Sequence, residues 1–233
     1  IHERLVGSEM CIRDRLGIEQ GLSNNSVVNI TQDKDGFLWF ATEEGLNKFD
    51  GNRFINYYKH TNHISGNELN SIYADPTEPI IWIATQRAGM NAYNYEKDEL
   101  TVFTHDDSNP NSLITNDVTH ISPASDGNLW LSTNNGLSCL DINKLFFVNY
   151  SISEGLPNKQ FNYNSVYRAD DGLLYFGTIN GMIAFYPENL QMHHNIAQVE
   201  FTDFKIYGKS VTPDTIGSPL NKNIEEADEI YLN

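Results

Sequence analysis

Several polar side chains of this sequence occur at the same point of a repeated pattern, in short turns that follow a threonine. They are Glu43, Glu44, Gln86, Arg87, Asn134, Asn135 and Asn180. Carboxylate, amide and guanidinium groups together suit a polyhydroxylated ligand, because they donate hydrogen bonds to hydroxyl groups and accept hydrogen bonds from them. Asn next to Gly is also usual in hairpin turns. We therefore treat these residues as candidate ligand contacts, with a structural turn role as the alternative for each.

Arg87 differs from the other candidates because it is the only basic residue in these turns. Its acidic surroundings predict that the guanidinium either forms an ion pair with Glu43 or Glu44 or contacts a ligand. We favour the ion pair, because surface pairs of this kind are common. Such a pair would contribute little to stability.

The sequence lacks the residue arrangements of enzymes and metal sites. Asp33-Lys34-Asp35-Gly36 resembles the start of a calcium loop, but the later ligands and the closing Glu are missing, so we predict a turn. The histidines of the connecting segments show no metal-ligand spacing. They are His60, His63, His105, His193 and His194. Because nucleophile elbows, phosphate-binding glycine loops and paired carboxylates are also missing, we predict no catalytic residue, no metal site and no cofactor.

The two cysteines, Cys11 and Cys139, have neither a partner motif nor metal-ligand spacing. Cys139 occupies the repeat position that holds Lys48, Ala92 and Ala184 in the other copies. We therefore predict that Cys139 is a small residue within a strand.

One sequence pattern occurs four times: GFLWFATEEGLNKFD at 36–50 returns in variant form at 79–94, 127–141 and 172–187. Its aromatic anchors, separated by 43, 48 and 45 residues, are Trp39, Trp82, Trp130 and Tyr175. This period is typical of four-stranded propeller blades, whereas helical repeats would show long stripes with a 3.6-residue period. We therefore predict an all-β fold, a β-propeller of four four-stranded blades. The candidate turns are expected to share one face with the blade connections, which add Asn24, Asn25, Asn116 and Asn158.

Each copy is expected to form an antiparallel meander. In the first copy we predict strands at 26–33, 37–42, 45–49 and 54–58. The second strand is apolar on both faces, as expected for a blade that lies between two neighbours. In every copy it ends on a threonine whose hydroxyl is expected to bond the backbone of the next turn: Thr42, Thr85, Thr133 and Thr178. Four blades are few for radial closure, so the propeller is expected to be incomplete, with a closed four-bladed ring as the alternative.

The composition limits the partners that the chain can have. Its 233 residues include 39% hydrophobic residues, enough for a packed core, and carry a formal net charge of −16. Nucleic acid and anionic membranes would repel such a chain, because no basic cluster compensates. No stretch approaches the roughly 20 apolar residues of a membrane span. A neutral or cationic small ligand, or another protein, is the partner class that fits.

The repeats resemble a known family. GLSNNSVVNITQDKDGFLWFATEEGLNKFDGNRFINY at 21–57 and the connection NPNSLITNDVTHI at 109–121 resemble the two-component regulator propeller repeat. That repeat is found in the extracytoplasmic sensor regions of hybrid two-component histidine kinases. The fourth copy, at 154–190, resembles the final blade of the family. VEFTDFKIYGKSV at 199–211 is similar to the opening of the three-tyrosine domain, an immunoglobulin-like β-sandwich.

These similarities lead to an expected domain organisation. Residues 1–15 match nothing downstream, and VGSEMCIRDR resembles a translated sequencing-adapter read, so we expect this segment to be non-native. Propeller blades are expected within 16–190, at about 21–60, 66–106, 111–152 and 155–190. A linker at 191–198 and the truncated start of a three-tyrosine domain at 199–233 are expected to follow.

The resemblance implies a periplasmic sensor region that binds an oligosaccharide. It further implies that occupancy is transmitted to downstream three-tyrosine and histidine kinase domains, with a homodimer as one arrangement. Contact with nucleic acid and a membrane span are not expected for this region. Two other functions remain open: a propeller enzyme that acts on glycans as a lyase or hydrolase, and a protein-interaction scaffold. The enzyme is disfavoured because no His lies in the turns between second and third strands.

Overall fold

The computed structural model describes residues 15–190, 203, 205–213, 218–220 and 222. It divides into two compact units between Gln191 and Met192, and each unit is described by itself. The expected non-native segment, except Arg15, and the expected linker at 191–198 lie outside the described residues.

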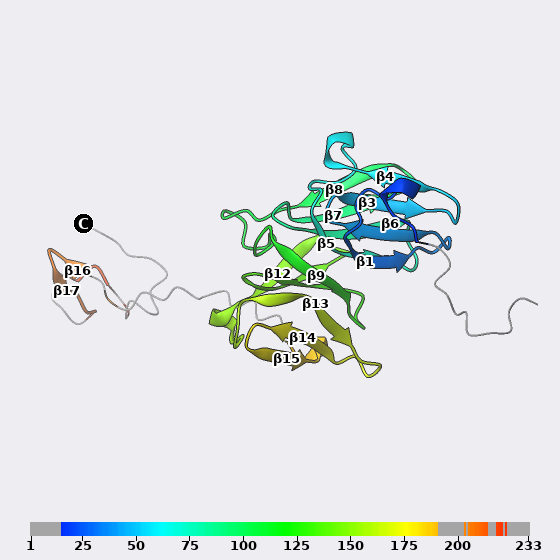
Figure 1. Ribbon diagram of the computed structural model, residues 1–233. Helices are drawn as coiled ribbons and strands as arrows, with labels where there is room; N and C mark the ends of the chain where they lie inside the picture. The colour runs from blue at the N-terminus through cyan, green and yellow to red at the C-terminus, as the bar shows by residue number, and fades with distance from the viewer. Residues whose placement is uncertain (1–14, 191–202, 204, 214–217, 221, 223–233) are drawn as a thin grey trace, which may run out of the picture. The chain divides into compact units, whose positions relative to one another are not determined.

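The first unit consists of antiparallel sheets, one for each copy of the repeat (Figure 1). Blade 1 contains β1 (Val27–Gln32), β2 (Leu38–Thr42), β3 (Gly45–Phe49) and β4 (Phe54–Tyr57). Blade 2 contains β5 (Leu69–Ala74), β6 (Ile80–Thr85), β7 (Met90–Asn94) and β8 (Glu99–Phe103). Blade 3 contains β9 (Val118–Pro123), β10 (Leu129–Thr133), β11 (Gly136–Asp141) and β12 (Phe146–Tyr150). Each strand pairs with the next along the chain, so the predicted propeller-blade meander is confirmed.

Blade 4 differs from the expected four-stranded sheet. Within the described residues it has three strands, β13 (Phe161–Arg168), β14 (Leu174–Thr178) and β15 (Gly181–Phe185). After β15 the chain enters a short 3-10 helix, η5 (Pro187–Asn189), instead of returning along the sheet. Proline has no N–H to donate to a ladder, which disfavours continued pairing there. The other 3-10 helices among the described residues are η2 (Ile18–Gln20), η3 (Lys59–Thr61) and η4 (Ile152–Glu154).

Apolar side chains fill the spaces between successive blades. Separate core clusters lie between blades 1 and 2, between blades 2 and 3, and between blades 3 and 4. The aromatic anchors point toward the next blade: Trp39 contacts Tyr93 and Tyr95, and Trp130 contacts Phe185. A strand that supplies side chains to two such cores must be apolar on both faces, as the sequence predicts.

Tyr175, the anchor of blade 4, is only partly buried. The outward faces of the two end blades carry other exposed apolar side chains, with Ile30 57%, Tyr167 65% and Met182 71% exposed. In the sheet, each of these residues lies opposite a residue of the neighbouring strand. Those partners are on the face of the blade that does not contribute to the inter-blade cores. In the described part of the chain the blades therefore form an open arc, as expected for an incomplete propeller.

The threonine that ends each second strand closes the following turn, as predicted. Its hydroxyl donates to the carbonyl oxygen of the turn glycine, at 2.8 Å for Gly45, 2.7 Å for Gly89, 2.7 Å for Gly136 and 3.1 Å for Gly181. The hydroxyl oxygen of the threonine also accepts a hydrogen bond from the backbone N–H of the residue before that glycine. The path of each turn is thus set by residues within the repeat.

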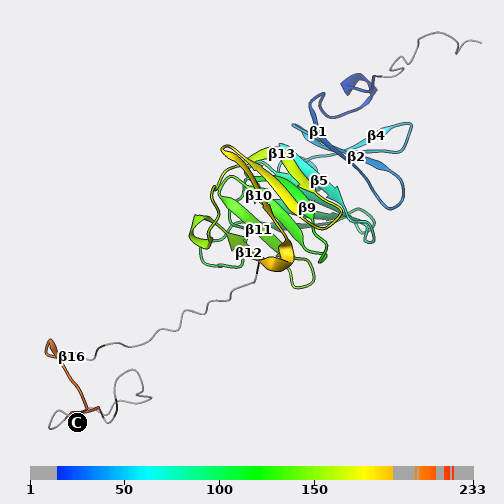
Figure 2. The ribbon, with the colours of Figure 1, turned by 90° about the horizontal axis from the view of Figure 1, so that it is seen from below.

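The first strand of each blade is innermost. β1, β5, β9 and β13 pack against one another around the axis, and Figure 2 shows β5, β9 and β13 side by side. Their first residues follow the blade connections, so polar groups of those connections lie near the axis on one face.

The second unit is described only in part. β16 (Lys205–Ile206) and β17 (Lys209–Ser210) pair as an antiparallel hairpin. Most of the region at 199–233 lies outside the described residues, so the three-tyrosine domain stays a prediction.

Candidate ligand-binding site

The turns between second and third strands lie beside the blade connections. In each blade a backbone N–H of the turn donates to a carbonyl oxygen of the connection. The pairs are Glu43 to Ser26, Gln86 to Glu68, Asn134 to Asp117 and Ile179 to Gln160. These bonds bring the polar side chains of both segments onto one face, as the propeller pattern predicts.

A cavity of about 650 Å³ opens on this face. Carboxylates, amides, a tyrosine and two aliphatic side chains from blades 1, 2 and 4 line it. They are Glu43, Glu44, Glu68, Asn24, Asn67, Asn70, Gln86, Asn164, Tyr163, Val28 and Leu69. The volume lies within the range of small-molecule sites, but the lining is more polar than most of them, which points to a hydroxyl-rich ligand.

Three of the candidate residues lie in this cavity. Glu43 and Glu44 are exposed, and Gln86 is half-buried. Glu43 and Glu44 come from blade 1 and Gln86 from blade 2, so the inter-blade packing brings them together. Asn24, from the connection before blade 1, lines the same space.

Arg87 forms an ion pair with Glu68 at 3.0 Å, not with Glu43 or Glu44, so the predicted partner was wrong. Glu68 belongs to the same blade, and its carbonyl oxygen already holds the N–H of Gln86, the residue next to Arg87. The backbone contact therefore decides the pairing. Arg87 lies outside the cavity lining, and its charge faces one of the acidic residues of the wall.

The asparagine candidates are held by other groups. Asn134 donates to Asp117 at 3.0 Å, and Asn180 donates to Asn158 at 3.2 Å. Asn135 uses its backbone N–H to close the turn on Thr133. These asparagines are not among the residues that line the cavity, and in the described structure they support the turns instead.

Sequence reasoning missed several lining residues, of which Glu68 and Tyr163 are the most informative. Glu68 stands at the start of an innermost strand, where nothing in the local pattern marks it. The segment that contains Tyr163 is longer than the equivalent segment of blade 1. Phe161 and the turn glycine Gly172 are 11 residues apart, whereas Val27 and the turn glycine Gly36 are 9 apart. The extra length of the fourth copy was the signal that could have found it.

Asp117 is a partly buried carboxylate on the same face as the cavity. Its Oδ2 accepts from Asn134, while its Oδ1 is buried without a hydrogen-bond partner in the described structure. Burial raises the pKa of this carboxyl, and the positive charge of Arg87 opposes the shift. Since the pKa in the folded state exceeds that in the unfolded state, ionisation of Asp117 costs stability. This cost is absent at pH values below the pKa of Asp117 in the unfolded state. It grows as the pH rises through the pKa of Asp117 in the folded state.

We expect Asp117→Asn to raise the melting temperature at neutral pH, because it removes a poorly solvated charge. The gain should shrink as the pH is lowered from neutral into the acid range, where the raised pKa lets the wild-type carboxyl take up its proton. Thermal unfolding followed across this pH range measures it. Asp170→Asn, at an exposed carboxylate, is the matched control. A difference between Asp117→Asn and wild type that does not change with pH would contradict this account.

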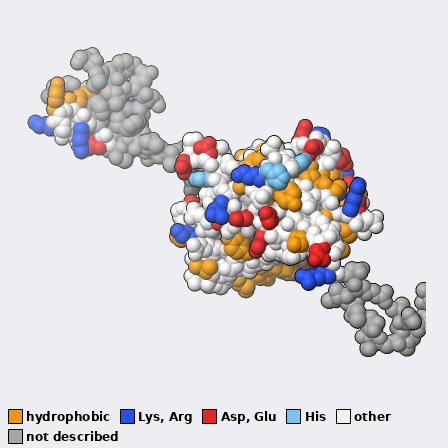
Figure 3. Space-filling model, turned by 45° about the horizontal axis from the view of Figure 1, so that its top comes forward, with side chains coloured by type: hydrophobic (Ala, Val, Ile, Leu, Met, Phe, Trp, Pro, Cys, Tyr) orange, Lys and Arg blue, Asp and Glu red, His pale blue; other side chains and the backbone are white. Residues whose placement is uncertain are grey.

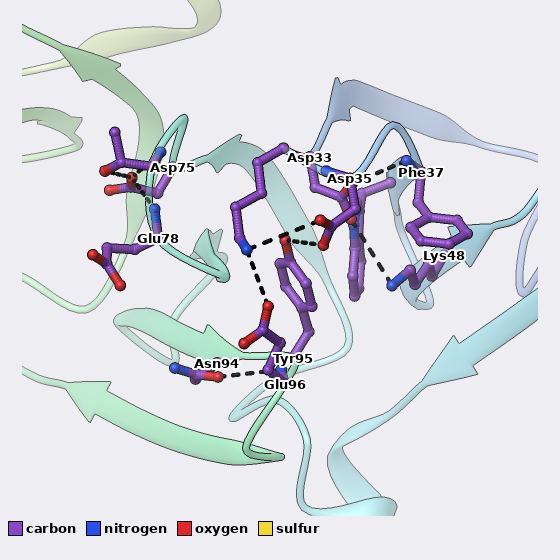
Figure 4. Close-up of polar contacts among 12 residues, drawn as sticks. Asp33, Asp35, Phe37, Lys48, Asp75, Glu78, Asn94, Tyr95 and Glu96 are labelled. Atoms are coloured by element: carbon purple, nitrogen blue, oxygen red, sulfur yellow. Dashed lines mark hydrogen bonds and ion pairs between the residues drawn. The ribbon is translucent and has the colours of Figure 1, made fainter.

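The segment that resembles a calcium loop forms a turn, as predicted. The Oδ1 of Asp33 accepts the backbone N–H groups of Asp35 and Phe37, at 3.0 and 2.9 Å. Its Oδ2 accepts the indole N–H of Trp39 at 2.7 Å, and Lys48 lies 3.9 Å away (Figure 4). Both carboxylate oxygens are therefore committed to the chain itself.

Cys139 lies buried in β11 opposite Trp130, as expected for a small strand residue. Burial raises the pKa of its thiol to about 12, so the thiolate is scarce at neutral pH.

The visible surface shows no continuous basic area. On the face drawn in Figure 3, acidic, basic and apolar side chains are interspersed. None of the helices in the described residues is long and apolar enough to cross a bilayer.

The sequence matches the family described as two component regulator propeller over residues 21–44 and 112–135. Histidine kinase P4 of Formosa agariphila is 28% identical over 210 residues, which are 87% of this chain and 15% of that protein. The extracellular domain of a hybrid two component system from B. thetaiotaomicron is 51% identical, with a TM-score of 0.69 over 76% of this chain and 25% of that one. The extracellular domain of a one component system from the same organism is 26% identical, with a TM-score of 0.62 over 75% of this chain and 26% of that one.

The chain therefore spans about a quarter or less of the length of these relatives. Together these findings show that the chain contains two-component regulator propeller repeats.

Proposed function

We propose that this chain is part of the ligand-binding propeller of a two-component sensor, and that it binds an oligosaccharide without converting it. The similarity to extracellular domains of such systems supports a sensor role and a periplasmic location. The similarity to a histidine kinase supports a kinase as the partner that receives the signal.

The cavity is the observation that carries the ligand class. Glu43, Glu44 and Glu68 present carboxylate oxygens that accept hydrogen bonds from hydroxyl groups. The side-chain amides of Asn67 and Gln86 both donate and accept. A sugar offers hydroxyls in both roles around its ring, so this lining satisfies it better than it would satisfy an apolar molecule.

The charge of the site narrows the class to neutral or cationic sugars. Within the lining the carboxylates have no basic side chain among them, and Arg87 is held outside by Glu68. The chain as a whole carries a formal net charge of −16. A uronic acid or a sulfated sugar would be repelled at close range, where Coulomb interactions are least screened.

The position of the cavity suggests how binding is transmitted. Because its lining comes from blades 1, 2 and 4, a bound ligand contacts blades that pack through different core clusters. A ligand that touches all of them favours the arrangement of blades in which those contacts form together. That shift in the population of arrangements is the signal that we propose reaches the kinase.

Thermal unfolding of the chain with a panel of neutral, amino and uronic oligosaccharides tests the proposal. A ligand at about 100 times its Kd stabilises the native state by about 2.7 kcal/mol, which should raise the melting temperature by roughly 5–11 °C. We expect such a shift with a neutral or amino oligosaccharide and none with the uronic series. Glu44→Gln and Glu68→Gln should reduce the shift, whereas Glu99→Gln, on the outermost strand β8, should not.

Other outcomes would decide against the proposal. If no member of the panel shifts the melting temperature, the sensor reading fails and a protein-interaction scaffold is favoured. If the bound oligosaccharide is cleaved, and Glu43→Gln abolishes the cleavage, the chain is an enzyme that acts on glycans.

A further inference from the structure

The innermost strand of blade 4 contains a wide bulge. In β13 the pairing with β14 passes from Phe161–Thr178 to Val166–Phe176, so residues 162–165 stand opposite Gly177 alone. In blade 1 the pairing passes from Val27–Thr42 to Asn29–Ala41, with a single extra residue. Blade 4 thus carries two residues more than blade 1 at this point of the innermost strand.

Gly177 makes room for the bulge. The same repeat position holds Ala41 in blade 1, Ala84 in blade 2 and Ser132 in blade 3. A Cβ at Gly177 would overlap the side chain of Ser165, which occupies that space. A glycine is therefore required here by the close approach of the bulge.

Hydrogen bonds hold the bulge across the axis. The side-chain amide of Asn164 donates to the carbonyl oxygen of Val28 in blade 1 at 3.1 Å, and its oxygen lies 3.3 Å from Nδ1 of His120 in blade 3. Asn162 donates to the carbonyl oxygen of Thr178 at 3.0 Å. The backbone of Asn164 is left-handed, with φ 50°, a conformation that asparagine tolerates better than most residues.

The bulge places an aromatic side chain in the cavity. Tyr163 is 51% exposed and lines the space that Glu43, Glu44 and Glu68 also line. A large exposed aromatic side chain that is anchored on both sides by hydrogen-bonded neighbours is well placed to cover the apolar face of a pyranose ring. The carboxylates would then receive the equatorial hydroxyls of the same sugar.

We propose that residues 162–165 form the specificity element of the site, in which Tyr163 stacks on a sugar ring and Gly177 and Asn164 are positioning residues. The proposal rests on the function proposed above and adds that the ligand presents an apolar ring face to the bulge. Sugars whose axial hydroxyls interrupt that face should bind less well.

Isothermal titration with the neutral oligosaccharide that gives the largest thermal shift tests the stacking residue. Tyr163→Ala should weaken binding about tenfold or more, because the apolar contact is lost. Tyr163→Phe, which keeps the ring, should stay within about threefold of wild type. Tyr167→Ala removes an exposed tyrosine of the same strand that does not line the cavity, and should leave the affinity unchanged.

The positioning residues are tested by Gly177→Ala and Asn164→Gly. Gly177→Ala introduces the residue that blades 1 and 2 already contain, so folding should survive while the bulge is displaced. We expect faster amide hydrogen exchange in residues 161–166 and a loss of affinity like that of Tyr163→Ala. The double variant Tyr163→Ala with Gly177→Ala should bind no more weakly than either single variant, because both act through one contact. Asn164→Gly keeps the backbone conformation but removes both cross-axis bonds, and should show the same exchange and affinity changes.

The outcomes separate the two proposals. Binding that survives Tyr163→Ala but is lost in Glu68→Gln overturns the role of the bulge and leaves the proposed function standing. Unchanged hydrogen exchange and affinity in Gly177→Ala and Asn164→Gly overturn the positioning role. If wild type binds no oligosaccharide, the proposed function and this inference fall together.

Discussion

Replacing Asp33 by alanine should lower the free energy of unfolding of the propeller unit by about 3 kcal/mol or more. The carboxylate side chain is 1% exposed and accepts three hydrogen bonds, one of them from the buried indole of Trp39. It is also the counter-charge of Lys48, whose side chain is 16% exposed. The alanine variant would leave a nearly buried ammonium group without its anion. Urea unfolding followed by tryptophan fluorescence measures the loss.

The aromatic rings around Lys48 are not expected to offset this loss. Its Nζ lies 4.1 Å from the ring centre of Phe37, 4.7 Å from that of Tyr95 and 5.2 Å from that of Trp39. Cation–π contacts contribute about 0.5–2 kcal/mol each, depending on desolvation, and they are already present in the wild type. They cannot increase when the carboxylate is removed.

Blade 3 supplies the matched control for Asp33. There Ala124 stands at the position of Asp33, Cys139 at that of Lys48, and the indole N–H of Trp130 has no hydrogen-bond partner in the described structure. A blade therefore tolerates an unbonded indole when no ammonium is present. Adding Lys48→Cys to Asp33→Ala copies this combination and should restore part of the lost stability.

Asp35→Ala, at a carboxylate that is 43% exposed, should cost less than about 1 kcal/mol. A loss in Asp33→Ala no larger than in Asp35→Ala would show that the buried carboxylate contributes little.

Gly136→Ala should destabilise the chain by roughly 2–6 kcal/mol. Gly136 is buried and has φ 133°, a conformation that costs L-residues about 1–3 kcal/mol. A Cβ at this position would also overlap the carbonyl oxygen of Tyr150 in β12. Displacing a backbone carbonyl of the neighbouring strand adds about 1–3 kcal/mol of overpacking strain.

Gly181→Ala separates the two causes. Gly181 occupies the same repeat position in blade 4 and has a similar φ of 123°, but nothing lies within 4 Å of the added Cβ. β15 has no further strand beside it in the described residues, so only the backbone cost of about 1–3 kcal/mol applies. Chemical denaturation of both variants measures the difference. Equal losses for the two alanines would mean that the contact with Tyr150 is relieved without cost.

The sequence alone determined the fold class, the blade order and the strand limits of the first blade. Strands predicted at 37–42, 45–49 and 54–58 match β2, β3 and β4 to within a residue at each end. Success was possible because the signals are local. Thr42 and Gly45 close their turn within one repeat. A second strand that is apolar on both faces indicates that the blade packs against a neighbour on each side.

Only the tertiary structure decided which polar residues meet. Glu43, Glu44 and Gln86 converge on one cavity, but the asparagine candidates do not, although all occupy equivalent turns. Repeats that look alike differ in which neighbours they have in space, and the candidate turns of blades 3 and 4 do not line this cavity. Arg87 pairs with Glu68 because a backbone bond beside it brings that connection close.

The bulge of blade 4 shows the same limit most clearly. Its extra length is visible in the sequence, but not the side on which the additional residues emerge. That side is decided by the space above Gly177 and by the partners of Asn164 in blades 1 and 3, which come from residues far apart in the chain. Local sequence specifies the strands and turns because their bonds are local, whereas a site built across blades depends on contacts that exist only once the blades have packed.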